Sequence, residues 1–242
     1  MDKVSFGHED VAPAEKTARV RGVFSSVASR YDLMNDLMSG GQHRLWKDLF
    51  VRRIRPRRGE AILDMAGGTG DIAFRMARAG ASVIVADINP DMLAVGRERA
   101  AKRGIDTLAW AEENAERLSF ADKSFDAYTI AFGIRNVTDI PAALGEAYRV
   151  LRTGGRFYCL EFSRTRWPGF GTLYEVYSRH FVPRIGKAVA KDEESYRYLI
   201  ESIERFPDMP RFARMIEDAG FRNIGTEPIL GGLVAIHSGW KV

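Results

Sequence analysis

Ala61-Ile-Leu-Asp64-Met65-Ala66-Gly67-Gly68-Thr69-Gly70-Asp71-Ile72 is the stretch that decides the fold. A short apolar run at 61–65 is followed by a glycine-rich turn, and helical spacing of apolar residues resumes over 72–79. Glycine adopts backbone conformations that other residues avoid and lets a ligand approach the chain closely. The stretch therefore predicts a strand, a tight turn and a helix whose free N–H groups face a ligand.

The alternation of strand and helix continues along the chain. Strands are expected at 82–87, 107–111, 125–132 and 156–162, and helices at 90–103 and 141–151. A Gly154-Gly155 turn is expected between the second helix and the strand at 156–162. A last helix at 210–219 leads to two strand-like runs that end at 234–237. We predict one α/β domain over 1–242 with a Rossmann-like, mostly parallel sheet and an antiparallel hairpin at its C-terminal end.

Two segments lie outside this alternation. Residues 19–50 have helical spacing that Gly40-Gly41 interrupts, which predicts an N-terminal helical cap. Residues 164–206 are aromatic and basic, and we expect an insertion in helical pieces that covers the ligand edge of the sheet.

Composition indicates an ordinary globular enzyme. The 242 residues are 45% hydrophobic and 28% charged, and apolar runs stay far below the roughly 18 residues that a membrane span needs. The N-terminus lacks the basic start and apolar stretch of a secretory signal, so we expect a cytoplasmic protein. The lone Cys159 lies in an apolar strand pattern and is expected to be buried.

Much of the formal charge of +4 is concentrated in the arginine run at 52–58. A run of this kind is either a solvated loop or a contact for anionic lipid headgroups or phosphates. Because aromatic residues do not interleave with the arginines, we expect no nucleic-acid partner.

The ligand of an open parallel sheet binds outside the carboxyl ends of its strands. Asp87 ends the second strand, where an acid would bind the ribose diol of either a nicotinamide dinucleotide or S-adenosylmethionine. Asp64 would repel a pyrophosphate but attract the ammonium of S-adenosylmethionine, so charge favours the methyl donor. The third strand ends in polar residues at 112–114, either a mere loop or the edge that meets adenine.

The fourth strand ends in Phe132-Gly133-Ile134-Arg135-Asn136. We expect the end of this strand to face the substrate that accepts the methyl group. Arg135 and Asn136 offer two strong hydrogen-bonding side chains there. The alternative for Arg135 is an ion pair at the surface.

Three further stretches resemble the UbiE type of ubiquinone and menaquinone biosynthesis C-methyltransferases. Tyr31-Asp-Leu-Met-Asn-Asp-Leu-Met-Ser-Gly-Gly-Gln-His43-Arg-Leu-Trp46 fits the first signature of that family, and 149–163 fits the second. Residues 180–186 and 195–199 resemble the family's insertion. The resemblance covers nearly the whole chain.

The resemblance implies a class I fold, S-adenosylmethionine as cofactor and methylation of a ring carbon of a polyprenylated quinol. Carried over by position, it implies cofactor contacts from Thr69, Asp87, Asn114 and Ala115. Ala131 stands where the family often has serine, and Thr153 where it usually has proline. The full set that we expect around the cofactor is Asp64, Gly67, Gly68, Thr69, Gly70, Asp87, Asn114, Ala115 and Ala131.

Methylation of a ring carbon requires the neighbouring hydroxyl to lose its proton. We expect Arg135 to stabilise that oxygen or to orient a water, with Asn136 assisting. Tyr31, His43 and Tyr196 are weaker candidates that either line the quinol ring or pack in the core.

Several alternatives stay open at the level of sequence. The acceptor is a benzoquinol, a naphthoquinol or both, and a homodimer is not excluded. Because the prenyl tail lies in the bilayer, we expect peripheral contact with the membrane surface or with a quinone-synthesis complex, through the arginine run and the insertion. A methyltransferase of other specificity, a nicotinamide oxidoreductase and a non-catalytic scaffold are the competing hypotheses.

Overall fold

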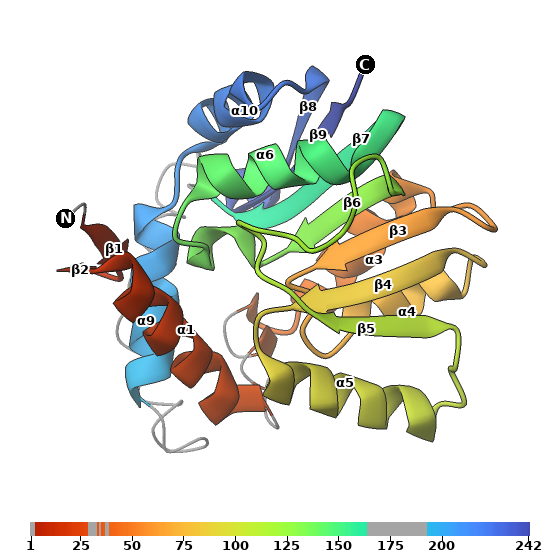
Figure 1. Ribbon diagram of the computed structural model, residues 1–242. Helices are drawn as coiled ribbons and strands as arrows, with labels where there is room; N and C mark the ends of the chain where they lie inside the picture. The colour runs from red at the N-terminus through yellow and green to blue at the C-terminus, as the bar shows by residue number, and fades with distance from the viewer. Residues whose placement is uncertain (1–2, 29–32, 34, 37–38, 164–192) are drawn as a thin grey trace.

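The computed structural model describes residues 3–28, 33, 35–36, 39–163 and 193–242. Its centre is a seven-stranded sheet of order β5-β4-β3-β6-β7-β9-β8 (Figure 1). The strands are β3 (Ala61–Met65), β4 (Ser82–Asp87), β5 (Leu108–Glu112), β6 (Phe125–Ala131), β7 (Leu151–Phe162), β8 (Arg222–Ile229) and β9 (Val234–Trp240). β9 runs antiparallel to both β7 and β8, and the other neighbours are parallel. The predicted fold class is confirmed.

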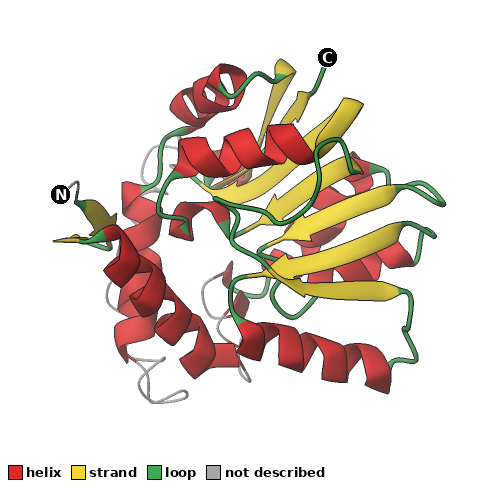
Figure 2. Ribbon diagram, viewed as in Figure 1, coloured by secondary structure: helices red, strands yellow, loops and turns green. Residues whose placement is uncertain are grey.

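Helices cover both faces of the sheet (Figure 2). α3 (His43–Ile54), α4 (Asp71–Ala77) and α5 (Pro90–Lys102) pack in one apolar cluster that includes Phe50 and Val85. α6 (Ile140–Val150) and α10 (Met209–Asp218) pack in the other, with Leu63 and Phe157. A parallel sheet that is buried on both faces needs strands that are apolar throughout, which explains the uninterrupted runs in the sequence.

Helix starts follow local capping. Asn89 accepts the backbone N–H groups of residues 91 and 92 at the start of α5. Asp139 accepts the N–H of Ala142 at the start of α6, and Asp208 accepts that of Arg211 at the start of α10. A proline follows each cap within the first two helical positions, where its missing N–H costs nothing. These signals set the helix boundaries close to the predicted ones.

The N-terminal region differs from the prediction. α1 (Pro13–Val27) begins before residue 19, and a small hairpin of β1 (Val4–Phe6) and β2 (Glu9–Val11) precedes it. α1 packs on α9 (Glu193–Arg205), the described part of the predicted insertion, through a cluster that includes Val20 and Leu199. The two helices lie side by side although about 170 residues separate them in the chain (Figure 1).

Strand β7 also begins earlier than expected. It starts at Leu151 and includes Gly154 and Gly155, which the sequence assigned to a turn. The register against β6 shifts between Phe125 and Ala127, so these glycines form an irregularity within the strand rather than a connection outside it. Among the described residues no helix combines the length and apolar character of a membrane span.

Candidate functional site

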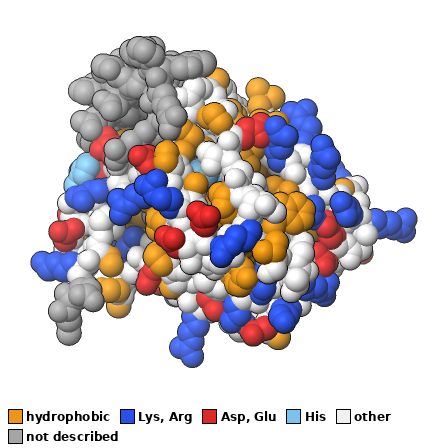
Figure 3. Space-filling model, turned by 90° about the horizontal axis from the view of Figure 1, so that it is seen from above, with side chains coloured by type: hydrophobic (Ala, Val, Ile, Leu, Met, Phe, Trp, Pro, Cys, Tyr) orange, Lys and Arg blue, Asp and Glu red, His pale blue; other side chains and the backbone are white. Residues whose placement is uncertain are grey.

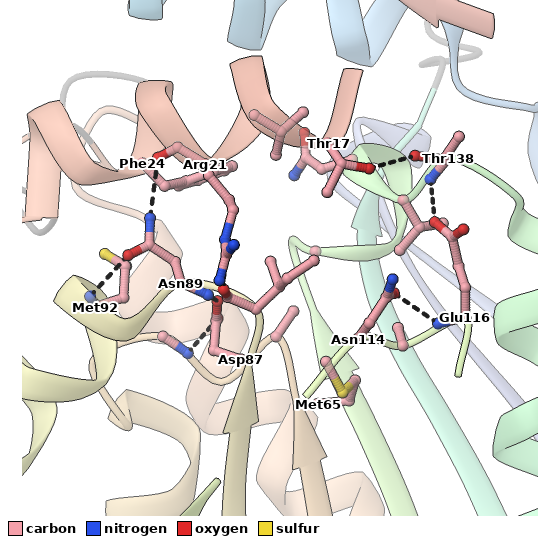
Figure 4. A pocket seen from close by; sticks show the side chains of 18 of the residues that line it. Thr17, Arg21, Phe24, Met65, Asp87, Asn89, Met92, Asn114, Glu116 and Thr138 are labelled. Atoms are coloured by element: carbon pink, nitrogen blue, oxygen red, sulfur yellow. Dashed lines mark hydrogen bonds between the residues drawn. The ribbon is translucent and has the colours of Figure 1, made fainter. Parts of the chain in front are cut away.

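A pocket lies at the carboxyl edge of the sheet, beneath α1 (Figure 4). Its walls come from α1, the ends of β3 and β4, residues 114–116, residues 132–133 and residues 136–138. The edge at which the sequence predicts a ligand therefore carries this pocket. The contribution of α1, through side chains such as Arg21 and Phe24, was not foreseen from the sequence.

The glycine turn after β3 is shaped by close contacts. A Cβ on Gly67 would lie 2.7 Å from Val85 Cγ1 and 2.9 Å from the Asp64 carbonyl oxygen, so a side chain does not fit there. Ala66 has a φ of 50°, a left-handed conformation that costs energy outside glycine. This strained turn brings the backbone of Gly68 to the pocket wall.

Asp87 ends β4 and forms part of the same wall. Its Oδ2 accepts the Gly68 N–H at 2.9 Å, and its Oδ1 accepts the Asn89 N–H at 2.8 Å. Burial raises the pKa of Asp87 to about 6, against the lowering effect of these N–H groups. The two N–H groups fix the carboxylate at the mouth of the turn and leave lone pairs of both oxygens for a ligand.

Asp64 is buried behind the turn, with 1% of its surface exposed. Its Oδ1 accepts the hydroxyl of Thr129 at 2.7 Å, whereas its Oδ2 has no hydrogen-bond partner among the described residues. Burial raises the pKa of Asp64 to about 7. An unpartnered buried carboxylate oxygen is costly, which is the condition expected where a ligand completes the site.

The third strand contributes through the residues that follow it. Asn114 Oδ1 accepts the N–H of Glu116 at 2.9 Å, which closes a turn, and Asn114 and Ala115 line the pocket. Of the nine expected cofactor residues, Gly68, Asp87, Asn114 and Ala115 thus form the wall.

The other five lie behind the wall or beside it. Thr69 is 1% exposed and its hydroxyl accepts Arg99 Nη1 at 3.1 Å, so it faces α5. The remaining members are Asp64, Gly67, Gly70 and Ala131, which do not line this pocket.

The loop after β6 is the opposite wall. Phe132 has a φ of 56°, and a Cβ on Gly133 would lie 2.4 Å from the Ala66 Cβ. The loops that follow β3 and β6 therefore press against each other and need glycine at that contact. The 3₁₀ turn η2 (Ile134–Asn136) follows, and Asn136 lines the pocket.

Arg135 points away from this pocket. Its Nη1 donates to Glu161 Oε1 at 2.7 Å and to the Phe132 carbonyl oxygen at 2.8 Å, and its Nε donates to Ser202 Oγ at 3.2 Å. The side chains of Arg135 and Glu161 are 5% and 1% exposed, so the pair is buried rather than at the surface. Arg135 instead borders a second cavity between η2, α9 and the N-terminal hairpin.

Glu161 was not identified from the sequence. It is a charged residue inside the apolar run of β7, and that mismatch is the signal that could have revealed it. Burial raises its pKa, and the guanidinium of Arg135 opposes the shift.

Of the three weaker substrate candidates, only the side chain of His43 is described. Tyr31 and the side chain of Tyr196 lie outside the described residues. His43 is 3% exposed, and its Nε2 lies 2.9 Å from Asp36 Oδ1. It does not line the pocket beneath α1, and burial lowers its pKa.

The cap is held over the pocket by polar contacts with the end of β4. Arg21 Nε donates to the Ile88 carbonyl oxygen at 2.9 Å, and Arg21 also pairs with Glu112. Asn89 Nδ2 donates to the Arg21 carbonyl oxygen at 3.0 Å (Figure 4). Ser25 Oγ donates to Asp91 Oδ2 at 2.6 Å. α1 is thus attached to the strand that carries Asp87.

The fold is that of solved S-adenosylmethionine-dependent methyltransferases. One from Aquifex aeolicus has a TM-score of 0.64 at 14% identity, covering 86% of this chain and 97% of that chain. One from Thermotoga maritima has a TM-score of 0.66 at 20% identity, covering 92% of this chain and 100% of that chain.

Sequence comparison is more specific. A curated protein from Zymomonas mobilis, named ubiquinone/menaquinone biosynthesis C-methyltransferase UbiE, is 67% identical over 100% of both chains. One of the same name from Bradyrhizobium diazoefficiens is 57% identical over 98% of this chain and 96% of its own. The model of the ubiE/COQ5 methyltransferase family matches residues 13–241. On this evidence the chain belongs to the ubiE/COQ5 methyltransferase family.

Proposed function

We propose that this chain transfers a methyl group from S-adenosylmethionine to a ring carbon of a polyprenylated quinol, as a step of ubiquinone or menaquinone biosynthesis. The names of its full-length relatives supply the acceptor class. The observation that carries the proposal is that Asp87 and Asn136 lie in the walls of one pocket. We assign Asp87 to the cofactor and Asn136 to the acceptor.

The described residues fit this cofactor. In the proposed complex Asp87 accepts the ribose hydroxyls, and Asn114 and Ala115 border the adenine. Asp64 lies beside this pocket and not in its wall, and we assign its unpartnered Oδ2 to the methionine ammonium, because a cation beside this oxygen would offset the cost of its burial. Gly67, Thr69, Gly70 and Ala131 would act by shaping the turn and the strand ends. A dinucleotide is disfavoured, because its pyrophosphate would face this carboxylate.

When bound, S-adenosylmethionine would supply an electrophilic methyl group; the products would be the methylated ring, S-adenosylhomocysteine and the proton lost from the ring carbon. The ring carbon becomes nucleophilic when the neighbouring hydroxyl ionises, so the protein must stabilise an oxyanion beside the reacting carbon. Asn136, in the wall, is the described residue that we assign to this oxygen. Arg135 is assigned a positioning role behind the wall, because Glu161 and Phe132 engage its guanidinium. This reverses the order of importance expected from the sequence.

The arginine run lies on the far side of the molecule. Arg53, Arg55, Arg57 and Arg156 border a groove of about 620 Å³ next to the start of β3, at the edge opposite the pocket. In Figure 3, Lys and Arg side chains gather on the right-hand side of the molecule. The parallel strands begin on this same side in Figure 1. Arg53 and Arg156 already pair with Glu227 and Glu60. We propose that Arg55 and Arg57 contact an acidic protein of a quinone-synthesis complex, because a bilayer touching this surface would hold the acceptor far from the pocket. Binding to anionic vesicles that is lost in Arg55→Glu/Arg57→Glu would instead support membrane contact.

The experiment for the main proposal is methyl transfer with purified protein. Labelled S-adenosylmethionine should methylate a short-chain demethylmenaquinol, a 2-methoxy-6-prenyl-1,4-benzoquinol or both, and comparison of the two acceptors identifies the ring. S-adenosylhomocysteine should raise the melting temperature and NAD should not, since a ligand stabilises only the state that it binds. Absence of transfer to both quinols by a protein that binds S-adenosylhomocysteine would overturn the acceptor assignment.

A further inference from the structure

The helix α9, the described part of the insertion, reaches the acceptor wall through one side chain. The Tyr198 hydroxyl, on α9, donates to Asn136 Oδ1 at 3.1 Å. Both residues are buried, with 3% of Tyr198 and 9% of Asn136 exposed. The two residues are 62 positions apart in the chain, so this contact exists only because α9 packs against η2.

Tyr198 is itself held in place by apolar contacts. Its ring stacks on Phe6 of β1 with centroids 4.2 Å apart and an interplanar angle of 17°. It belongs to the cluster in which α1 and α9 pack together. Burial raises the pKa of the Tyr198 phenol, so the hydroxyl keeps the proton that it donates to Asn136 Oδ1.

A side-chain amide has one accepting end and one donating end, and the end bonded to tyrosine cannot also face the pocket. We propose that Tyr198 fixes the amide of Asn136 so that its NH₂ group, and not its carbonyl oxygen, faces the acceptor. Tyr198 is then a positioning residue that acts through Asn136. This inference rests on the proposed function and specifies the chemistry of its acceptor site.

The consequence concerns the form in which the acceptor is bound. An N–H donor stabilises an oxyanion more than a neutral hydroxyl, because hydrogen bonds to charged acceptors are stronger. In the proposed complex the ring hydroxyl beside the methylated carbon therefore loses its proton more readily against Asn136. An amide turned the other way would present an acceptor and favour the neutral hydroxyl.

The test is a double-mutant cycle on methyl transfer. Asn136→Ala should lower kcat about 100-fold, the usual cost of losing one oxyanion donor. Tyr198→Phe, which keeps the stack on Phe6, should lower kcat about 10-fold because the amide is free to turn. The double variant should be no slower than Asn136→Ala alone. Tyr158→Phe, in β7 beside the groove of the arginine run and outside the pocket, is the matched control and should retain wild-type kcat.

A pH profile separates positioning from general damage to the fold. In Tyr198→Phe the acidic limb of the plot of kcat against pH should move to higher pH, because the ring oxyanion is less well stabilised. Asn136→Asp keeps an acceptor for Tyr198 but removes the donor, and it should be as slow as Asn136→Ala. Dissociation constants for S-adenosylhomocysteine should be unchanged in all these variants.

The outcomes distinguish this inference from the proposed function. Wild-type kcat and an unshifted acid limb in Tyr198→Phe, together with a slow Asn136→Ala, would overturn the role of Tyr198 and leave the function standing. Normal kcat in Asn136→Ala would remove the acceptor role of Asn136 itself. Effects of Tyr198→Phe and Asn136→Ala that multiply in the double variant would show that the tyrosine acts elsewhere.

Discussion

The two halves of the pocket are built in different ways. On the cofactor side, Asp87 ends β4 and is held by the nearby backbone N–H groups of Gly68 and Asn89. Asp64, one residue before the end of β3, accepts the hydroxyl of Thr129 on the adjacent strand β6. On the acceptor side, Arg135 and Asn136 depend on partners from β7 and α9. We infer that the cofactor half tolerates changes elsewhere in the molecule, whereas the acceptor half responds to the packing of distant elements.

The largest expected effect tests that dependence at the buried ion pair. Arg135→Ala should lower the free energy of unfolding by about 3–5 kcal/mol, because it leaves the Glu161 carboxylate buried without its partner. Turnover should fall sharply, while the folded fraction binds S-adenosylhomocysteine with nearly wild-type affinity. Urea unfolding and calorimetric titration measure the two quantities.

The double change Arg135→Met/Glu161→Leu is the control for that prediction. It removes both charges, so most of the lost stability should return while turnover stays low. If Arg135→Ala proved as stable as the wild type with unaltered turnover, the acceptor half would not depend on this pair.

The next effect concerns the cofactor half alone. Asp87→Ala should weaken S-adenosylhomocysteine binding about 100-fold, or about 2.7 kcal/mol, because the ribose hydroxyls lose a charged acceptor. Titration calorimetry measures the change, and Glu98→Ala, an exposed acid on α5, is the matched control. Equal affinity in Asp87→Ala and the wild type would contradict the assignment of this wall.

A smaller effect depends on pH. Because the pKa of Asp64 is about 7, its carboxylate is ionised only above that pH, and affinity for S-adenosylhomocysteine should fall as pH drops from 8 to 6. Asp64→Asn should bind more weakly at pH 8 and lose much of this pH dependence, with the rest set by Asp87. Titrations at several pH values measure it, and a dependence identical in wild type and variant would exclude Asp64.

Ionisation of Asp64 favours ligand binding but lowers the stability of the ligand-free protein. The unfolded carboxyl ionises near pH 3.8 and the folded one near 7, so ionising Asp64 lowers stability as pH rises through this window. Ligand-free Asp64→Asn should therefore melt a few degrees higher than the wild type at pH 8, at about 2–4 °C per kcal/mol, with little difference at pH 4. A melting temperature of Asp64→Asn below that of the wild type at pH 8 would show that the protein already compensates the charge of the Asp64 carboxylate.

The smallest effect concerns the cap. Arg21→Ala should weaken cofactor binding only a few-fold, because its pair with Glu112 is exposed and such pairs contribute at most about 1 kcal/mol. The control is Arg19→Ala, on the same helix, which pairs with Glu9 and Glu15 instead. Equal affinity of both variants for the cofactor would show that the contacts of Arg21 do not contribute to cofactor binding.

The cofactor half was largely predictable because its information is local. The positions of Asp64, Gly68 and Asp87 follow from the spacing of apolar runs and glycines, since parallel strands end at a common edge. Thr69 shows the limit of this reasoning. It belongs to the same turn, but α5 approaches from the other side and Arg99 bonds its hydroxyl.

The acceptor half was predictable only in position. The sequence placed Arg135 and Asn136 at the end of a strand, yet gave no sign of which one lines the pocket. That choice depends on Glu161, 26 residues away from Arg135, and on Tyr198, 62 residues away from Asn136. Contacts at such separations leave no periodic pattern in the sequence.

The sequence by itself determined the order of strands and helices, the glycine turn and the two acids at the strand ends, because periodicity and backbone preference act between near neighbours. Only the tertiary structure decided that α1 covers the pocket, that Arg135 turns toward Glu161 and that Asn136 faces inward. Those outcomes follow from burial: a charge or amide removed from water takes the orientation in which a partner satisfies it, and that partner comes from wherever the chain has packed.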